Sequence, residues 1–238
     1  MKWTDIPTGQ TNCAFQRFMG SFGDNADPVV SQLNSDDAYL NRVSVLCKNN
    51  GFEPSVEQAL ARKIMSANVF GVEEAIKHYG INPAKRQLAY MAEVPYSERT
   101  LVECKDSHIL TAYFRNPIVD IRARTAHTKL PDGQNPLFYK QDWYDNQPFA
   151  IRNGQLDWYL IRKTPVPDST SKMWSEQQGL LDAKIEETPE ARVMAYTVVC
   201  HFLNTGERLF EKVYVRCVYL ASDGYRVCVR FIPDWLYV

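Results

Sequence analysis

The stretch Cys217-Val-Tyr-Leu-Ala-Ser-Asp-Gly-Tyr-Arg-Val-Cys-Val-Arg230 decides the architecture of the C-terminal part of the chain. Asp223-Gly224 is a pair that two-residue type I′ turns prefer, and strand-forming residues stand on both sides of it. The sequence therefore predicts a β-hairpin that turns at Asp223-Gly224.

Counting outward from this turn assigns two faces to the hairpin. Leu220 opposite Val227 and Val218 opposite Val229 give one apolar face, which we expect to pack in the core. The valines further upstream have the opposite parity, so a bulge is expected near Arg216-Cys217.

The other face of the hairpin mixes tyrosine, arginine and small residues. Tyrosine and arginine are favoured in protein contacts, so this face is the candidate binding surface. We expect it to bind a protein or a small ligand. The candidate contact residues are Tyr219, Ala221, Asp223, Tyr225, Arg226, Cys228, Arg230 and Tyr237.

Residues 36–105 carry the apolar periodicity and the caps of a helical unit. Ser55 and Gln58 stand at the spacing of a capping box, and Gly80 is placed to end a helix that begins at Val72. Residues 1–35 are rich in glycine, asparagine, aspartate and serine, so we expect irregular chain there with one short helix at most.

Residues 106–238 change to a mixed pattern. Strands are expected at 109–114, 118–122 and 156–162, and helices at 172–182 and from Thr188 to about Gly206. The fold class is therefore α+β: an N-terminal helical unit, then short antiparallel strands and two helices. The expected divisions are an irregular segment at 1–35, a helical subdomain at 36–105 and an α+β domain at 106–238.

The charges of the 238-residue chain nearly balance, with 27 Lys and Arg against 28 Asp and Glu. This balance argues against a general electrostatic attraction to nucleic acid or to a membrane, although it leaves room for a local basic patch. The polar start lacks the apolar stretch of a secretory signal, and no run of 18 apolar residues occurs. We expect a cytoplasmic protein with no membrane partner.

The six cysteines are scattered, without the spacing of a disulfide or zinc framework. Two cysteine–histidine pairs come closest to the pattern of a nucleophile and its base, Cys104 with His108 and Cys200 with His201. Neither sequence spacing guarantees that the thiol and the imidazole lie within hydrogen-bond distance. We therefore expect free thiols, no metal, no cofactor and no catalytic residue.

Two alternatives stay open beside a non-catalytic binding protein. Ser169 and Lys172 form a Ser-x-x-Lys pattern, which would place a hydrolase-like site there, although helix capping explains the same residues. Lys77, Lys85 and Arg86 lie where a helix-turn-helix would meet phosphates, although a plain helical bundle has the same pattern.

Four segments resemble uncharacterised proteins encoded by candidate-phylum bacteria, and the resemblance covers residues from about 34 onward. It implies no activity. The segments are Gly71–Gly80, Trp158–Gln177, Ala191–Thr197 and Thr205–Phe210.

The ends of such proteins are similar to the variable proteins of diversity-generating retroelements. That resemblance implies a C-type-lectin-like fold that displays diversified residues on a sheet surface. The Trp, Arg and Leu-Gly ending of those proteins is absent here. The residues that adenine mutagenesis could produce are Val218, Tyr219, Ala221, Asp223, Tyr225, Cys228 and Tyr237.

Overall fold

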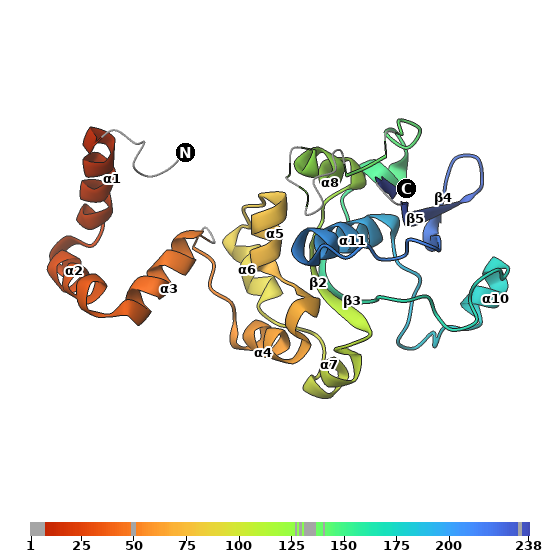
Figure 1. Ribbon diagram of the computed structural model, residues 1–238, viewed down its shortest axis with the longest axis horizontal. Helices are drawn as coiled ribbons and strands as arrows, with labels where there is room; N and C mark the ends of the chain where they lie inside the picture. The colour runs from red at the N-terminus through yellow and green to blue at the C-terminus, as the bar shows by residue number, and fades with distance from the viewer. Residues whose placement is uncertain are drawn as a thin grey trace. The chain divides into compact units, whose positions relative to one another are not determined.

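The computed structural model describes residues 8–48, 51–126, 128, 130, 137–139, 141–232 and 235–238. The chain divides into two compact units, Met1–Glu53 and Pro54–Val238. Helices and two small sheets make it an α+β protein, as predicted (Figure 1). The division near residue 53 differs from the boundaries at 36 and 106 that the sequence suggested, because residues 8–48 are helical throughout most of their length.

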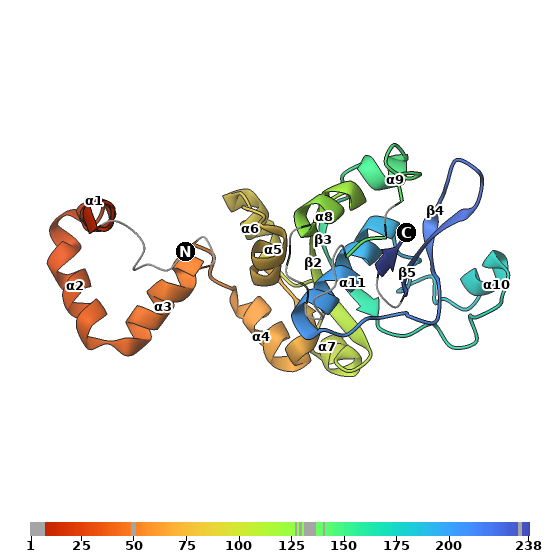
Figure 2. The same cartoon turned by 45° about the horizontal axis from the view of Figure 1, so that its top comes forward.

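In its described residues, the N-terminal unit contains three α-helices: α1 (Thr8–Gly20), α2 (Ala26–Ser35) and α3 (Asp37–Lys48) (Figures 1 and 2). The expectation of irregular chain over residues 1–35 is therefore wrong for the described part. Phe18 of α1 contacts Phe22, just after the end of the helix, with ring centroids 5.0 Å apart. Before α3, the Asp36 carboxylate accepts backbone hydrogen bonds from Ala38 and Tyr39 at 2.9 and 3.0 Å.

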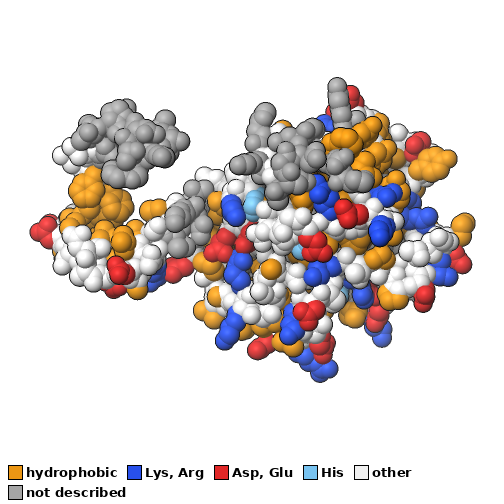
Figure 3. Space-filling model, in the orientation of Figure 1, with side chains coloured by type: hydrophobic (Ala, Val, Ile, Leu, Met, Phe, Trp, Pro, Cys, Tyr) orange, Lys and Arg blue, Asp and Glu red, His pale blue; other side chains and the backbone are white. Residues whose placement is uncertain are grey.

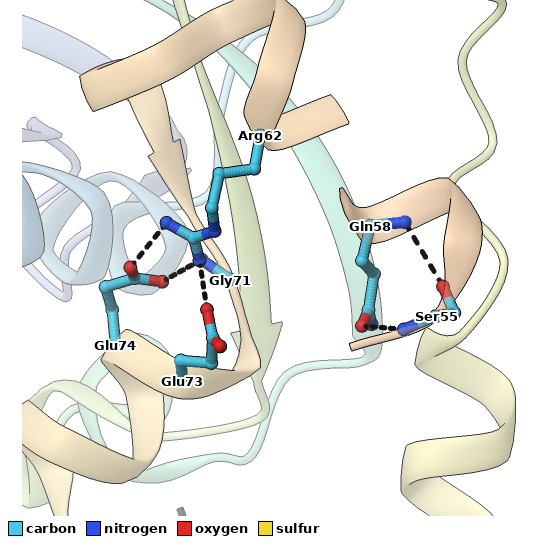
Figure 4. Close-up of polar contacts among 6 residues, drawn as sticks. All are labelled: Ser55, Gln58, Arg62, Gly71, Glu73 and Glu74. Atoms are coloured by element: carbon cyan, nitrogen blue, oxygen red, sulfur yellow. Dashed lines mark hydrogen bonds and ion pairs between the residues drawn. The ribbon is translucent and has the colours of Figure 1, made fainter. Parts of the chain in front are cut away.

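Helix α4 (Val56–Met65) opens with the predicted capping box, which the structure confirms. The Ser55 Oγ accepts from the backbone N–H of Gln58 at 3.1 Å, and the Gln58 Oε1 accepts from the backbone N–H of Ser55 at 3.0 Å (Figure 4). Gln58 also donates to the Met91 carbonyl at 2.7 Å, so the cap joins α4 to the end of α6 (Lys85–Met91).

Arg62 of α4 holds the start of α5 (Val72–Tyr79) (Figure 4). Its guanidinium lies 2.7 Å from a carboxylate oxygen of Glu74 and 2.7 Å from one of Glu73. The Glu74 carboxylate also accepts the Gly71 backbone N–H at 2.8 Å. The cluster therefore caps α5 and fixes the angle between two helices, while Gly80 in the left-handed region ends α5 as predicted.

The segment Ile118–Thr125 is helix α8, not the strand that its alternating apolar residues predicted. Ile118, Ile121 and Thr125 are buried, and their spacing is that of one helical face. The apolar residues of this short run fit both the two-residue period of a strand and the 3.6-residue period of a helix. Packing against α5 and α11 favours the helix.

The first sheet has the order β1–β2–β3. Strand β1 (Val69–Phe70) is parallel to β2 (His108–Phe114), and β2 is antiparallel to β3 (Leu156–Arg162). The strands expected at 109–114 and 156–162 are therefore confirmed. Helix α7 (Glu98–Cys104), which precedes β2, is capped by the Ser97 hydroxyl.

Helix α11 (Ala191–Thr205) is the centre of the second unit. Every residue from 191 to 202 is buried, because strands of both sheets and helices α5 and α8 pack around it (Figure 1). Its Tyr196 hydroxyl donates to the Ala112 carbonyl of β2 at 3.0 Å. The helix begins at Ala191, slightly after the predicted Thr188 cap, and ends at Gly206 as predicted.

The second sheet is antiparallel, with the order β4–β5–β6. Its strands are β4 (Val215–Leu220), β5 (Arg226–Ile232) and β6 (Trp235–Tyr237). The last strand is docked, since the Leu236 backbone exchanges hydrogen bonds with residues 137 and 139 at 2.8 and 3.0 Å. Two short helices lie nearby, α9 (Pro148–Ile151) and α10 (Trp174–Gln178), and α10 is shorter than the predicted 172–182.

None of the helices that the structure describes is long and apolar enough to cross a membrane. Pro131-Asp132-Gly133 is a sequence that favours a turn, and it lies outside the described residues.

Candidate functional site: the outer face of the C-terminal sheet

The hairpin turns through three residues, Ser222–Gly224, and not through two. Ala221 donates its backbone N–H to the Tyr225 carbonyl at 2.8 Å, and Gly224 donates to the Ala221 carbonyl at 2.9 Å. Gly224 has φ of 84°, which places it in the left-handed region that ends such three-residue loops. The Asp223 carboxylate accepts the Tyr225 N–H at 3.0 Å and stabilises the turn.

This extra loop residue changes the strand register. Leu220 pairs with Arg226, whereas the two-residue turn predicted that it would pair with Val227. A shift of one residue moves every side chain of one strand to the other face. The register then breaks between Arg216 and Leu220, so the bulge predicted near Arg216-Cys217 is confirmed.

The predicted faces are consequently correct for β5 and wrong for β4. Val227 and Val229 are buried, as expected. Val218 and Leu220, expected in the core, are 44% and 57% exposed, and Cys217 is buried in their place. Val218 and Leu220, which the predicted two-residue turn would place in the core, therefore belong to the surface.

The eight candidate contact residues divide into three groups. Tyr219 and Ala221 point inward with Cys217, so they leave the candidate contact surface. Asp223 and Tyr225 lie at the exposed hairpin tip, where Tyr225 is 76% exposed. Arg226, Cys228 and Arg230 alternate with the buried residues of β5, and Tyr237 pairs with Arg230 across β6.

We call the surface that points away from α11 the outer face. It combines the outward residues of the three strands with the hairpin tip. Its members are Arg216, Val218 and Leu220 of β4, Tyr225 at the tip, Arg226, Cys228 and Arg230 of β5, and Trp235 and Tyr237 of β6.

Aromatic rings and carbonyl groups hold the three arginines of this face in place. The Arg226 guanidinium lies 3.7 Å from the ring centre of Trp174 in α10, and it donates to the Val218 carbonyl. Arg230 lies 4.8 Å from the Tyr214 ring centre and donates twice to the Glu211 carbonyl, at 3.0 and 2.8 Å.

Arg216, the third, is bound by the segment around α10. Its Nη1 donates to the Lys172 carbonyl at 2.8 Å and to the Gln177 side chain at 2.9 Å. Sequence reasoning missed Trp174 and Tyr214, because neither lies near the hairpin turn in the chain. A tryptophan or tyrosine far along the sequence gives no signal that an arginine will stack on it.

The aromatic residues near the chain end extend the outer face. The Tyr139 ring centre lies 5.5 Å from that of Trp235 and 5.7 Å from that of Tyr237, with the latter pair stacked. In Figure 3, hydrophobic side chains gather at the upper right, near the region where Figure 1 marks the C-terminus. Aromatic clusters of this kind are common at the anchoring points of binding surfaces.

The inward side of β4 is fixed by a polar cluster at the start of α11. Arg192 bonds through Nε to the Glu190 carboxylate at 2.5 Å and through Nη2 to the Tyr219 hydroxyl. Burial raises the pKa of Glu190, but the hydrogen bonds from Arg192 and Tyr219 lower this pKa by more than burial raises it. The pKa of Glu190 therefore lies below its ordinary value. Tyr219 therefore anchors the sheet to α11.

The alternative site at Ser169 and Lys172 lies in the loop before α10. Its hydrogen bonds engage backbone groups: the Gln177 side chain donates to the Ser169 carbonyl at 2.6 Å, and Arg216 donates to the Lys172 carbonyl. Asp168 and Ser171 have positive φ values of 59° and 58°, which turn the loop sharply on either side of Ser169. These contacts connect the loop to the outer face.

Four of the thiols are in surroundings that favour the protonated form. Burial raises the pKa of Cys104, Cys200, Cys217 and Cys228. An activated thiol has a lowered pKa, so these cysteines lack the electrostatics of a nucleophile. His108, the base considered for Cys104, has its Nδ1 2.8 Å from the Ser107 hydroxyl.

A shallow depression beside α4 and α7 is lined by acidic and apolar residues. One carboxylate there is already used, since Glu57 accepts the Val94 backbone N–H at 2.8 Å. Within the described ranges, no group of three or more His, Cys, Asp or Glu side chains could hold a metal ion. The lining residues are Glu57, Leu60, Glu93, Val94, Tyr96, Glu98 and Leu101.

Lys77, Lys85 and Arg86 are all exposed, on α5 and at the start of α6. Five residues, Gly80–Ala84, separate the two helices. The three cations remain accessible to a ligand.

Comparison with known protein families, curated proteins and solved structures finds no match for this chain.

Proposed function

We propose that the protein is a non-catalytic binding protein and that the outer face of its C-terminal sheet contacts the partner. The observation that carries the proposal is the exposure of Val218, Leu220 and Tyr225 beside three oriented arginines. Apolar side chains grouped on an otherwise polar surface are typical of interaction sites. Arginine and tyrosine are among the residues that contribute most to protein interfaces.

The fixed arginines support the same proposal. Immobilising a long side chain on binding costs about 0.5–1.5 kcal/mol, and a side chain that is already held avoids most of that cost. Arg226 on Trp174, Arg230 on Tyr214 and Arg216 on the α10 segment are held in the free protein. The hydrolase-like alternative at Ser169 and Lys172 has less support, because the contacts of that loop orient Arg216.

The test is selection from a random peptide library displayed on phage, with the full chain immobilised. Selected peptides should bind the wild-type protein and should lose binding to the double variant Val218→Asp, Tyr225→Asp. A matched control is Val102→Asp, Tyr90→Asp, because these residues on α7 and α6 are 49% and 56% exposed and lie outside the outer face. Selected peptides that bind both double variants equally well would contradict the proposal.

We further propose that retroelement mutagenesis diversifies this surface. Val218, exposed on β4, Tyr225 at the tip and Cys228 on β5 are three residues that adenine mutagenesis could produce, and all three belong to the outer face. Deep sequencing of the gene in its source population tests the idea. Variation should concentrate in these codons, whereas an even spread over β4 and β5 would argue against diversification.

A further inference from the structure

We propose that the partner of the outer face is an acidic protein segment, with carboxylates flanking apolar side chains. This inference rests on the proposed function and specifies its ligand. It follows from the arrangement of the three arginines, from the absence of carboxylate partners for them among the described residues, and from the apolar residues between them.

The three arginines form a row along β5. Arg226, Cys228 and Arg230 are outward at steps of two residues, and Arg216 pairs directly with Cys228. Two residues of a strand span about 7 Å, so the backbone positions of Arg226, of Cys228 with its partner Arg216, and of Arg230 follow one another at about that interval. An extended segment that carries carboxylates on alternate residues has the same repeat.

The guanidinium groups of this row lack acidic partners in the part of the chain that the structure describes. Their hydrogen bonds go to the carbonyls of Val218, Lys172 and Glu211 and to the Gln177 amide. Elsewhere in the second unit, several arginines are paired with carboxylates, whereas Arg115 and Arg124 donate to the carbonyls of Gly154 and Tyr79. The pairs with carboxylates form at Arg62, Arg122, Arg162 and Arg192.

The charged groups that the structure describes next to the row do not pair with its arginines. The carboxylates of Glu176 and Asp223 accept hydrogen bonds from the backbone N–H groups of Met173 and Tyr225, at 2.6 and 3.0 Å, and form no ion pair with an arginine of the row. The exposed Glu211 offers its carbonyl to Arg230, and Lys212 beside it is a further exposed cation. The row therefore keeps a positive potential that attracts carboxylates.

The apolar part of the face favours a protein over a single-stranded nucleic acid. Val218 and Leu220 are aliphatic and exposed on the strand next to Arg226. Bases bind by stacking on aromatic rings, and two of the nearest rings, those of Trp174 and Tyr214, already carry an arginine on one side. Aliphatic side chains instead complement the apolar side chains of a peptide.

Fluorescence anisotropy on the full chain tests the inference with four labelled probes. They are a random copolymer of glutamate and tyrosine, polyglutamate, polylysine and oligothymidylate. We expect the glutamate–tyrosine copolymer to bind tightest and its affinity to fall as salt is added. The triple variant Arg216→Gln, Arg226→Gln, Arg230→Gln should weaken this binding by about tenfold or more.

The matched control is Lys77→Gln, Lys85→Gln, Arg86→Gln, which removes the same charge from α5 and α6 and should leave the affinity unchanged. If the triple arginine variant fails to fold, as circular dichroism would show, Val218→Asp with Leu220→Asp replaces it. Those residues are exposed, and the added carboxylates should repel the copolymer.

The remaining outcomes separate this inference from the proposed function. If oligothymidylate or polylysine binds the outer face more tightly than the copolymer, or if the phage selection yields basic or neutral peptides there, the surface binds but the acidic partner is wrong. If the copolymer does not bind, or if its affinity is unchanged in both sets of outer-face variants, the proposal of an acidic partner is also wrong. If, in addition, phage selection yields no peptide that depends on Val218 and Tyr225, the proposed function fails as well.

Discussion

The Tyr219 hydroxyl accepts a hydrogen bond from Arg192, whose guanidinium carbon lies 5.3 Å from the centre of the Tyr219 ring. Arg192 belongs to α11 and is nearly buried, so the contact joins β4 to the central helix. Tyr219 therefore supports the candidate surface from behind, and its neighbours Val218 and Leu220 form the surface itself.

Replacing Tyr219 by phenylalanine should lower the free energy of unfolding by about 1–3 kcal/mol, because a nearly buried guanidinium donor loses its acceptor. Tyr225→Phe is the control, since its hydroxyl is at the exposed tip, and we expect no measurable change. Urea denaturation compares the two variants with the wild type. Equal stability of all three proteins would contradict the structural role of Tyr219.

The register of β4 can be tested with two glutamine substitutions. Leu220→Gln should change the unfolding free energy by less than about 0.5 kcal/mol, because Leu220 is exposed. Val229→Gln should cost about 2–4 kcal/mol, because Val229 is 1% exposed and the amide would be buried without partners. Thermal denaturation distinguishes them, and a large loss for Leu220→Gln would favour the two-residue turn.

Arg62 should contribute more to stability than a typical surface arginine. Arg62→Met leaves the nearly buried Glu74 carboxylate without its cation and should cost about 1–2 kcal/mol. Arg99→Met is the matched control, because its pair with Glu103 lies on the exposed surface of α7. Unfolding by guanidinium chloride should show no measurable change in the free energy of unfolding for the control. An equal loss of stability in both variants would contradict the larger contribution of Arg62.

His78 should make the fold sensitive to acid. Burial, with a contribution from Lys77, lowers the pKa of His78 from 6.5 to about 4, although nearby Glu74 acts in the opposite direction. Between these values the unfolded chain binds a proton that the folded chain does not, so stability falls as the pH falls from about 7 to 4. The loss should be about 1–2 kcal/mol, allowing for the partial exposure of the ring.

The variant His78→Phe isolates this contribution. Its ring can keep the contact with Phe70, and the substitution removes the buried His78 Nε2, which has no hydrogen-bond partner among the described residues. Stability measured by urea denaturation from pH 4 to pH 7 should then depend less on pH than in the wild type. The same pH dependence in both proteins would show that other groups cause it.

The features that could be predicted from the amino-acid sequence are those that depend on neighbours in the chain. The Ser55–Gln58 capping box, the Gly80 and Gly206 helix ends, strands β2 and β3 and the bulge in β4 each follow from a few consecutive residues. Local hydrogen bonds and backbone preferences fix such features.

Tertiary structure decided the features that depend on distant partners. Ala221-Ser-Asp-Gly-Tyr225 fits both a two-residue and a three-residue loop, and the choice follows which residues of β4 pack against α11. The helical period of Ile118–Thr125 was selected in the same way, by burial against helices far along the chain. The outer face is the extreme case, because Trp174 is brought to Arg226 only when the loop before α11 folds onto the sheet. Side-chain packing, which no local pattern encodes, therefore decided which side of the hairpin became the surface.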